Sequence, residues 1–165
     1  MPQSTPSARP IPTFYRLFFT NIDPLLSLWA TYLDIFAPTT VLSSHIPSPL
    51  PDTGHIMILT QRAGHLLNCF LLSAILLRYT RDIKIWHIVE CGLLITDFAY
   101  GVATWRVLGE QGRLWPQEWR AEDWGSVGIT GFVTLVRLAF LARAGFSELE
   151  EEEQTIGKAK GRKML

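Results

Sequence analysis

Apolar and polar residues alternate along the chain in long blocks: four apolar stretches of about 22 residues are separated by segments rich in proline, glycine or charge. At a rise of about 1.5 Å per residue, a helix of that length crosses a hydrocarbon core of about 30 Å. We therefore predict an all-α protein, a four-helix transmembrane bundle with a polar interior. Its membrane-spanning segments are expected at residues 14–36, 56–77, 83–105 and 124–146.

A water-soluble helical bundle is the alternative, and it requires a polar face on every helix. The run FLLSAILL at residues 70–77 leaves too little polar surface for that. Composition favours the membrane class, since 48% of the residues are apolar although both ends of the chain are polar. Residues 1–13, with four prolines, are expected to be a disordered arm, and residues 147–165, an acidic run followed by a basic one, a charged cytosolic tail.

The charges of the chain balance, with 15 Lys and Arg against 15 Asp and Glu. Without a basic excess, nucleic acid is not an expected partner. Ten of the 15 basic residues lie near the N-terminus, in the second loop or near the C-terminus, so the positive-inside rule predicts that both termini are cytosolic. The ending Arg162-Lys163-Met164-Leu165 is close to a retrieval signal for the endoplasmic reticulum, which is the membrane we expect.

Each apolar stretch carries a stripe of polar residues at helical spacing. Ionisable groups inside a membrane are costly, so they are expected to face the interior of the bundle and to be functional. In chain order, the four stripes consist of Asp23 and Asp34; Gln61, His65 and Asn68; Glu90 and Asp97; and Ser126, Thr130, Thr134 and Arg137.

Arg137 is the only cation at its predicted depth, and it requires a carboxylate or a bound anion. Counting residues from the cytosolic ends places Arg137 level with Asp23, Glu90 and Asn68, so Asp23 or Glu90 is its expected partner. Asp97 is assigned to a second layer without a cation, where it is expected to be protonated and able to donate a proton. The other members of that layer are expected to be His65, Gln61 and Thr130.

Two further features concern the shape of the backbone and the loops. Pro24, directly after Asp23 in mid-span, is expected to kink the first helix and to free a backbone carbonyl one turn earlier. Trp115 and Trp119, in the third loop, admit two interpretations: an aromatic belt at the bilayer surface, or a lid over the mouth of a cavity. The loop histidines His45 and His55 are expected to be solvated.

We expect neither a metal nor a cofactor. His87 and Glu90 have the i, i+3 spacing of some metal ligands, but no second motif pairs with them. Cys69 and Cys91 lie in apolar runs, where a free thiol behaves as a small hydrophobe. The polar stripes also have a purely structural interpretation, because hydrogen bonds and ion pairs between helices stabilise membrane bundles.

The most distinctive motifs are Phe14-Tyr15-Arg16-Leu17-Phe18-Phe19-Thr20, Asp23-Pro24, the stripe from Gln61 to Asn68, Asp97-Phe98, Asp123-Trp124-Gly125-Ser126-Val127-Gly128, and Arg137. Together they resemble a family of small fungal four-span integral membrane proteins of uncharacterised function, over about residues 12–146. More loosely, the hydropathy and the intramembrane acids resemble the emopamil-binding and sigma-2-receptor-like (EXPERA) membrane domain and the membrane terpene cyclases of fungal secondary metabolism.

This looser resemblance implies a lipophilic, sterol- or isoprenoid-like ligand in an acid-lined cavity, and an isomerase or cyclase that protonates a double bond or an epoxide. Asp97 would be the proton donor and Asp23 or Glu90 a second catalytic acid, while Trp29, Trp105 or Trp124 would face the cation. The ligand-binding candidates are Gln61, His65, Asn68, Trp105, Trp124, Thr130 and Arg137. The alternative is a non-enzymatic lipid-binding accessory protein, or a scaffold for membrane-bound biosynthetic enzymes.

Overall fold

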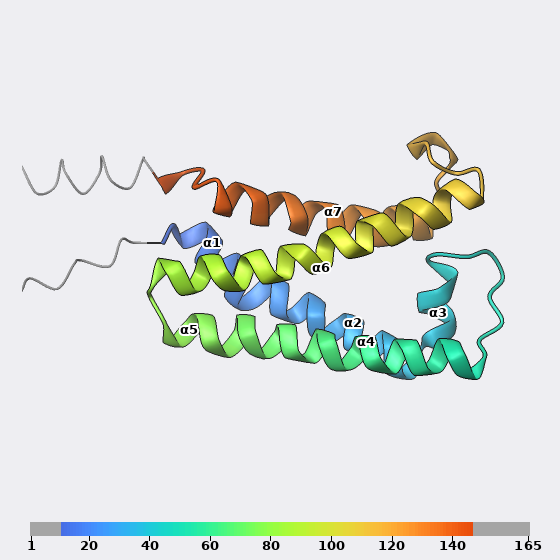
Figure 1. Ribbon diagram of the computed structural model, residues 1–165, viewed down its shortest axis with the longest axis horizontal. Coiled ribbons are helices and arrows are strands. Elements are labelled where there is room, and N and C mark those ends of the chain that lie inside the picture. The colour runs from blue at the N-terminus through green and yellow to red at the C-terminus, as the bar shows by residue number, and fades with distance from the viewer. Residues whose placement is uncertain (1–10, 147–165) are drawn as a thin grey trace, which may run out of the picture.

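The structure, a computed structural model, describes residues 11–146, and the regular secondary structure in that range is helical throughout. Four long helical rods account for most of it (Figure 1). The first rod comprises α1 (Thr13–Leu17), the π-helical turn η1 (Phe18–Ile22) and α2 (Asp23–Phe36). The second comprises α4 (Thr53–Leu71), the π-helical turn η2 (Leu72–Leu76) and α5 (Leu77–Tyr79). The third and fourth are α6 (Ile83–Glu110) and α7 (Ala121–Leu141).

These rods confirm the all-α prediction and overlap the four predicted helices. Two short helices were not predicted: α3 (Pro38–Ser43), which follows the first rod directly, and the 3-10 helix η3 (Pro116–Glu118), between α6 and α7. α6 also continues to Glu110, beyond its predicted end at residue 105. The predicted arm, up to residue 10, and the predicted tail, residues 147–165, lie outside the described residues.

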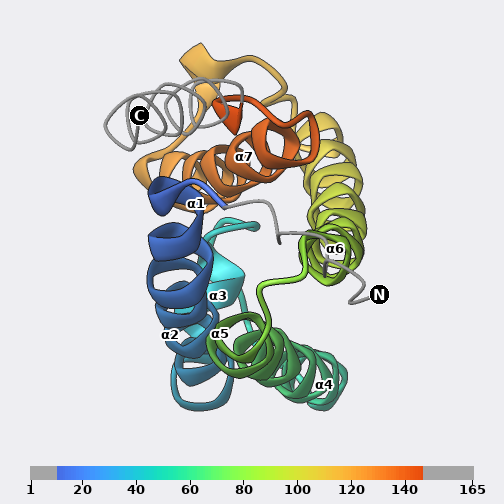
Figure 2. The same ribbon diagram turned by 90° about the vertical axis from the view of Figure 1, so that its left-hand side faces the viewer.

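The rods lie side by side as two antiparallel hairpins (Figures 1 and 2). α2 packs mainly against α4, and α6 mainly against α7, while η1 and η2 also contact each other. The start of α1, α5, the start of α6 and the end of α7 lie at one end of the molecule, here named the α1 end. α3 lies at the opposite end, here named the α3 end.

Side-chain caps mark the starts of two rods. Asp52 accepts a hydrogen bond from the backbone N–H of His55 at 2.8 Å, and the ring of His55 faces the backbone N–H of Asp52 in return. The backbone N–H of His55 therefore lowers the pKa of the Asp52 carboxyl, because it stabilises the ionised form. At the start of α6, Asp82 accepts a bond from the backbone N–H of Lys84 at 2.9 Å.

The first rod shows what Pro24 does to a helix. Proline has no N–H to offer to the carbonyl one turn earlier, which is that of Thr20. The guanidinium of Arg78, on α5, donates to that carbonyl at 2.7 Å and to Oδ1 of Asn21 at 2.8 Å. The predicted free carbonyl is thus confirmed, and it ties the first rod to the second within the π-helical turn.

Burial in this bundle is inverted relative to a water-soluble protein, whose charged residues are mostly exposed. Long apolar side chains lie on the outside: Leu25 is 64% exposed, Ile88 72% and Leu135 66%. α6 and α7 are long and apolar enough to cross a membrane. The buried polar and charged residues are Thr20, Asp23, Thr31, Asp34, Ser73, Glu90, Thr104, Asp123 and Arg137.

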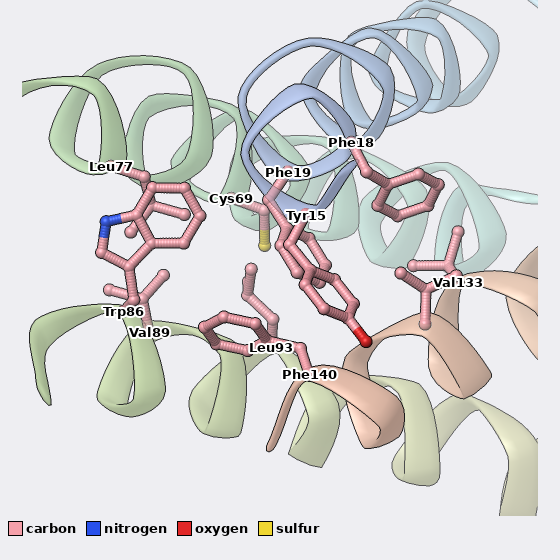
Figure 3. Close-up of a cluster of buried hydrophobic side chains, with 11 residues drawn as sticks. Tyr15, Phe18, Phe19, Cys69, Leu77, Trp86, Val89, Leu93, Val133 and Phe140 are labelled. Atoms are coloured by element: carbon pink, nitrogen blue, oxygen red, sulfur yellow. The ribbon is translucent and has the colours of Figure 1, made fainter. Parts of the chain in front are cut away.

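An aromatic core fills the α1 end of the bundle (Figure 3). Phe19 and Phe140 have no exposed surface, and their ring centroids are 5.4 Å apart in an edge-to-face arrangement. Tyr15 packs edge-on against Phe140 and donates its hydroxyl to the carbonyl of Ala144 at 3.0 Å. Trp86 is buried as well, with its indole N–H bonded to the carbonyl of Thr80 at 3.0 Å. The polar tips of both side chains are therefore satisfied, as burial requires.

Candidate functional site

Arg137, on α7, is the centre of a buried charge cluster. Its Nη2 donates to both carboxylate oxygens of Asp23, on α2, at 2.9 and 2.8 Å, and its Nε donates to Glu90, on α6, at 3.2 Å. Its Nη1 donates to Asp97, also on α6. The guanidinium is a planar fork with several donors, which lets one side chain bond three carboxylates.

This cluster confirms one sequence prediction and corrects another. Arg137 was expected to pair with Asp23 or Glu90, and it pairs with both. Asp97 was assigned to a separate layer without a cation, which is wrong, because Asp97 also pairs with Arg137. The assignment compared backbone levels only, whereas an extended arginine side chain reaches across more than one helical turn.

Charge is not balanced within the cluster. Three carboxylates surround one guanidinium, so full ionisation would leave a net negative charge in a buried site, at a large desolvation cost. Oε1 of Glu90 is buried and has no hydrogen-bond partner among the described residues. Both observations describe a site with more carboxylates than cations and with one buried carboxylate oxygen that lacks a partner among the described residues.

A cavity of about 390 Å³ lies between the two hairpins, on the α3 side of the cluster. Asp97 is the one residue of the cluster in its wall. The wall is formed by Leu26, Trp29, Ala30 and Leu33 of α2; Thr40 and Val41 of α3; Ser44 and His45; Arg62, His65 and Leu66 of α4; Thr96, Asp97 and Tyr100 of α6; and Gly125, Ser126, Ile129 and Thr130 of α7.

The cavity wall contains some of the predicted ligand-binding residues and excludes others. His65 and Thr130 line it, together with Asp97, and Arg137 lies directly behind Asp97. His65 approaches Thr96, on α6, at 3.2 Å.

Four other candidates are placed elsewhere. Gln61 and Asn68 are exposed on α4, and Trp105 and Trp124 are 62% and 53% exposed on outer surfaces, so the structure does not bring these four residues to the cavity. For Gln61 the reason is rotational. Arg62 points inward, and its neighbour in an α-helix is directed about 100° away.

An ion pair that the sequence analysis did not identify explains the rotation of α4. Nε of Arg62 donates to Asp34, on α2, at 2.8 Å, and the Asp34 side chain is fully buried whereas Arg62 remains 35% exposed. Asp34 belongs to the first predicted polar stripe, and Arg62 lies within the predicted span 56–77. The two side chains carry opposite charges and lie on consecutive predicted helices, and this pattern could have indicated an ion pair.

α3 covers the α3 end of the cavity, and three side chains contact the carbonyls of its last residue and of the two residues after it. Arg120 donates to the carbonyl of Ser43 at 2.9 Å, and Gln111 donates to that of His45 at 3.1 Å. Ser126 lies 3.5 Å from the carbonyl of Ser44. Helix C-termini leave carbonyls without partners in the helix, so these bonds anchor α3 as a cover.

The third loop supports this cover without forming it. Asp123, at the start of α7, pairs with both Arg113 and Arg120. The hydrogen bonds that the Arg120 guanidinium donates to the Asp123 carboxylate raise the pKa of Arg120, which stays charged. Trp115 is 69% exposed and Trp119 donates its indole N–H to the carbonyl of Arg113, and neither residue lines the cavity.

His45 is half-buried, whereas the sequence predicted a solvated side chain. It lines the cavity and packs edge-on against Tyr100, with ring centroids 5.7 Å apart. Burial lowers the pKa of His45, and the nearby guanidinium of Arg62 lowers it further, so both favour the neutral ring. Its position could not be read from the sequence, because it depends on α3 folding back over the bundle.

The fold and the site together define the class of this protein. It is an all-helical bundle in which a buried charge cluster lies beside a cavity. The chain belongs to the DUF7704 family, a domain of unknown function, whose family model matches residues 8–146. No curated protein and no solved structure matches the chain.

Proposed function

We propose that this protein is a four-span integral membrane protein with both termini in the cytosol. Two observations support the spans: the inverted burial, and four rods that each approach or exceed the length needed to cross a bilayer. The described basic residues near the α1 end include Arg16, Arg81 and Lys84, which favours that end as the cytosolic one. The endoplasmic reticulum is the membrane that we propose.

Within the membrane, we propose that the cavity holds a lipophilic molecule with a small polar group. Its volume of about 390 Å³ lies within the usual range for small-molecule sites. Leu33, Leu66 and Ile129 supply apolar wall, while His65, Asp97 and Thr130 form a polar patch beside the cluster. A sterol- or isoprenoid-like molecule, as implied by the resemblance to EXPERA domains, has this chemistry.

The function that this geometry supports best is proton transfer to that molecule, as in an isomerase or cyclase. The observation that carries it is the contact of Asp97 with both the cavity and a cluster holding more carboxylates than cations. A protonated Asp97 would transfer its proton to a carbon of a double bond, leaving a carbocation on the ligand and a carboxylate beside Arg137. Return of a proton from an adjacent carbon to Asp97 would complete an isomerisation.

Other residues would support this step. Trp29 lines the cavity and would offer an aromatic face to the cation, a role that Trp105 and Trp124 cannot fill from the outer surface. Arg137 would stabilise the carboxylate that forms on Asp97.

Binding is tested by native mass spectrometry of the protein purified from its own membranes. The wild type should retain one defined lipophilic molecule. Ala30→Trp, which fills the cavity, should lose it, whereas Ala103→Trp, on the exposed face of α6, should keep it. Equal retention by both variants would contradict binding in this cavity.

Catalysis is tested separately, by lipid analysis of a strain that lacks the protein. Accumulation of one intermediate, relieved by the wild type but not by Asp97→Asn, is the expected result. The alternative function, a non-enzymatic accessory or scaffold for membrane-bound biosynthetic enzymes, is favoured by the bridging of three helical segments by Arg137. It predicts that Asp97→Asn, if folded, relieves the accumulation fully.

A further inference from the structure

The cavity has two lateral sides, because it lies between two hairpins that pack mainly within themselves. One side is the seam between α4 and α6, and the other is the seam between α2 and α7. Figure 2 shows α7 next to the first rod and α6 on the other side of the molecule. The residues at these two seams differ in polarity and in how they are joined.

The seam between α4 and α6 is polar and bridged. His65 and Thr96 both line the cavity, and Nε2 of His65 lies 3.2 Å from Oγ1 of Thr96. Gln61 and Asn68 continue this polar edge on the outer surface of α4. Contact between such a surface and lipid chains is unfavourable, because amide and imidazole groups are poorly accommodated in hydrocarbon.

The seam between α2 and α7 is apolar and unbridged beside the cavity. Trp29, on α2, and Ile129, on α7, line the cavity and are nevertheless 58% and 53% exposed, so the cavity reaches the outer surface between them. Asp34 faces α4, and five residues of α-helix separate it from Trp29, a rotation of about 140°. Trp29 therefore lies on the edge of α2 that is turned away from α4 and toward α7.

This opening has clear limits along the bundle. Toward the α1 end it is closed by Phe18 against Phe132, with ring centroids 5.8 Å apart, and by the pair of Asp23 with Arg137. Toward the α3 end it extends to the level of Gly125, where the neighbouring Ser126 lies 3.5 Å from the carbonyl of Ser44. Between these limits, no hydrogen bond or ion pair joins α2 to α7 within residues 11–146.

We infer that the seam between α2 and α7 is a lateral portal, through which the lipophilic ligand enters the cavity from the bilayer. The inference rests on the proposed function. Trp29 forms one side of the portal, and Gly125 and Ile129 form the other. A Cβ at Gly125 would meet no atom within 4 Å, so the glycine leaves open space at the edge of the cavity.

Access can be measured without knowing the ligand. In a Cys69→Ala, Cys91→Ala background, Thr130→Cys places a single thiol in the cavity wall. The protein is reconstituted in phosphatidylcholine vesicles, and the thiol is reacted with N-phenylmaleimide, which dissolves in the bilayer, or with a charged trimethylammonium thiosulfonate, which does not. The portal predicts that the apolar reagent modifies the thiol readily and the charged reagent slowly.

Two changes at the seam should move the rate in opposite directions. Gly125→Leu should slow modification by N-phenylmaleimide about tenfold, and Trp29→Ala should speed it. Gly131→Leu is the matched control, because Gly131 lies on the same helix with the same open space and does not line the cavity. It should leave the rate unchanged, and thermal unfolding verifies that each variant is folded.

Three results would overturn the portal: an unchanged rate in Gly125→Leu and Trp29→Ala, faster reaction of the charged reagent, or acceleration by Thr96→Val, which opens the other seam. Failure of the proposed function is distinguishable. The proposed function fails if the wild-type protein retains no lipophilic molecule in native mass spectrometry. If Gly125→Leu and Trp29→Ala still change the modification rate as predicted, the portal exists but serves another function.

Discussion

The two ends of the bundle are built on opposite principles. At the α1 end, Phe19, Trp86 and Phe140 interlock without exposed surface, and the Arg137 cluster closes the interior behind them. At the α3 end, the helices leave a cavity, and the cover over it is held by hydrogen bonds and ion pairs of partly exposed side chains. We infer that the α1 end contributes most of the folding stability, and that the α3 end provides access to the cavity and ligand specificity.

The largest expected effect is at the boundary between the two ends. Arg137→Met should lower the free energy of unfolding by about 3 to 5 kcal/mol, because it leaves buried carboxylates without their cation. Arg62→Met, at the α3 end, leaves one buried carboxylate without its cation instead of three, and should cost less, about 2 to 3 kcal/mol. Denaturant unfolding in detergent micelles compares them, and equal losses would remove the distinction.

Apolar truncations should show the same contrast. Phe140→Ala removes a fully buried ring from the aromatic core and should cost about 3 to 4 kcal/mol. Ile129→Ala removes a half-exposed side chain from the cavity wall and should cost about 1 kcal/mol. Thermal unfolding in the same detergent is the measurement. A loss at Ile129 as large as that at Phe140 would mean that the cavity wall is packed as tightly as the core.

The cover itself should respond to a smaller change. Arg120→Ala removes the donor to the carbonyl of Ser43 and one of the two cations on Asp123, with an expected loss of about 1 to 2 kcal/mol. Hydrogen exchange should rise at residues 38–46 and stay unchanged in the aromatic core. Faster exchange throughout would indicate that the two ends unfold together.

The smallest effect is a pH dependence confined to the α3 end. Burial and Arg62 lower the pKa of His45 below its ordinary value of 6.5, with Arg120, Asp34 and Asp123 also nearby. The unfolded chain therefore takes up a proton at a higher pH than the folded one. The contribution of His45 is fully present above pH 6.5 and is lost as the pH falls below it. The protection factors for hydrogen exchange at residues 38–46, which are corrected for the intrinsic pH dependence of exchange, should fall below pH 6.5 in the wild type and not in His45→Gln.

Sequence reasoning recovered what depends on single helices and missed what depends on their rotation and on the loops. Counting residues from the ends of the spans brought Arg137 together with Asp23 and Glu90, because helical rise is regular. Counting residues could not show that Gln61 and Asn68 are exposed, since the rotation of α4 depends on the pair between Arg62 and Asp34.

The position of the cover also could not be predicted from the sequence. α3 follows α2 after a single non-helical residue, Ala37, and its position depends on bonds to Gln111 and Arg120, more than 60 residues away. Hydropathy reports the long apolar rods, not a six-residue helix in a proline-rich connection. Part of the cavity wall belongs to this segment, which is why His45 was misassigned.

The central claim, that lipid surrounds the rods and their polar groups face inward, is tested most directly by the oxygen accessibility of spin labels along α6 in lipid vesicles. Labels at Ile88, Ile95 and Val102, which share one exposed face, should collide often with oxygen and rarely with a water-soluble nickel chelate. Labels at Val89 and Leu93, which are buried, should collide rarely with either. Frequent collisions of the nickel chelate at Ile95 would contradict the claim, because that face of the helix would then lie in water.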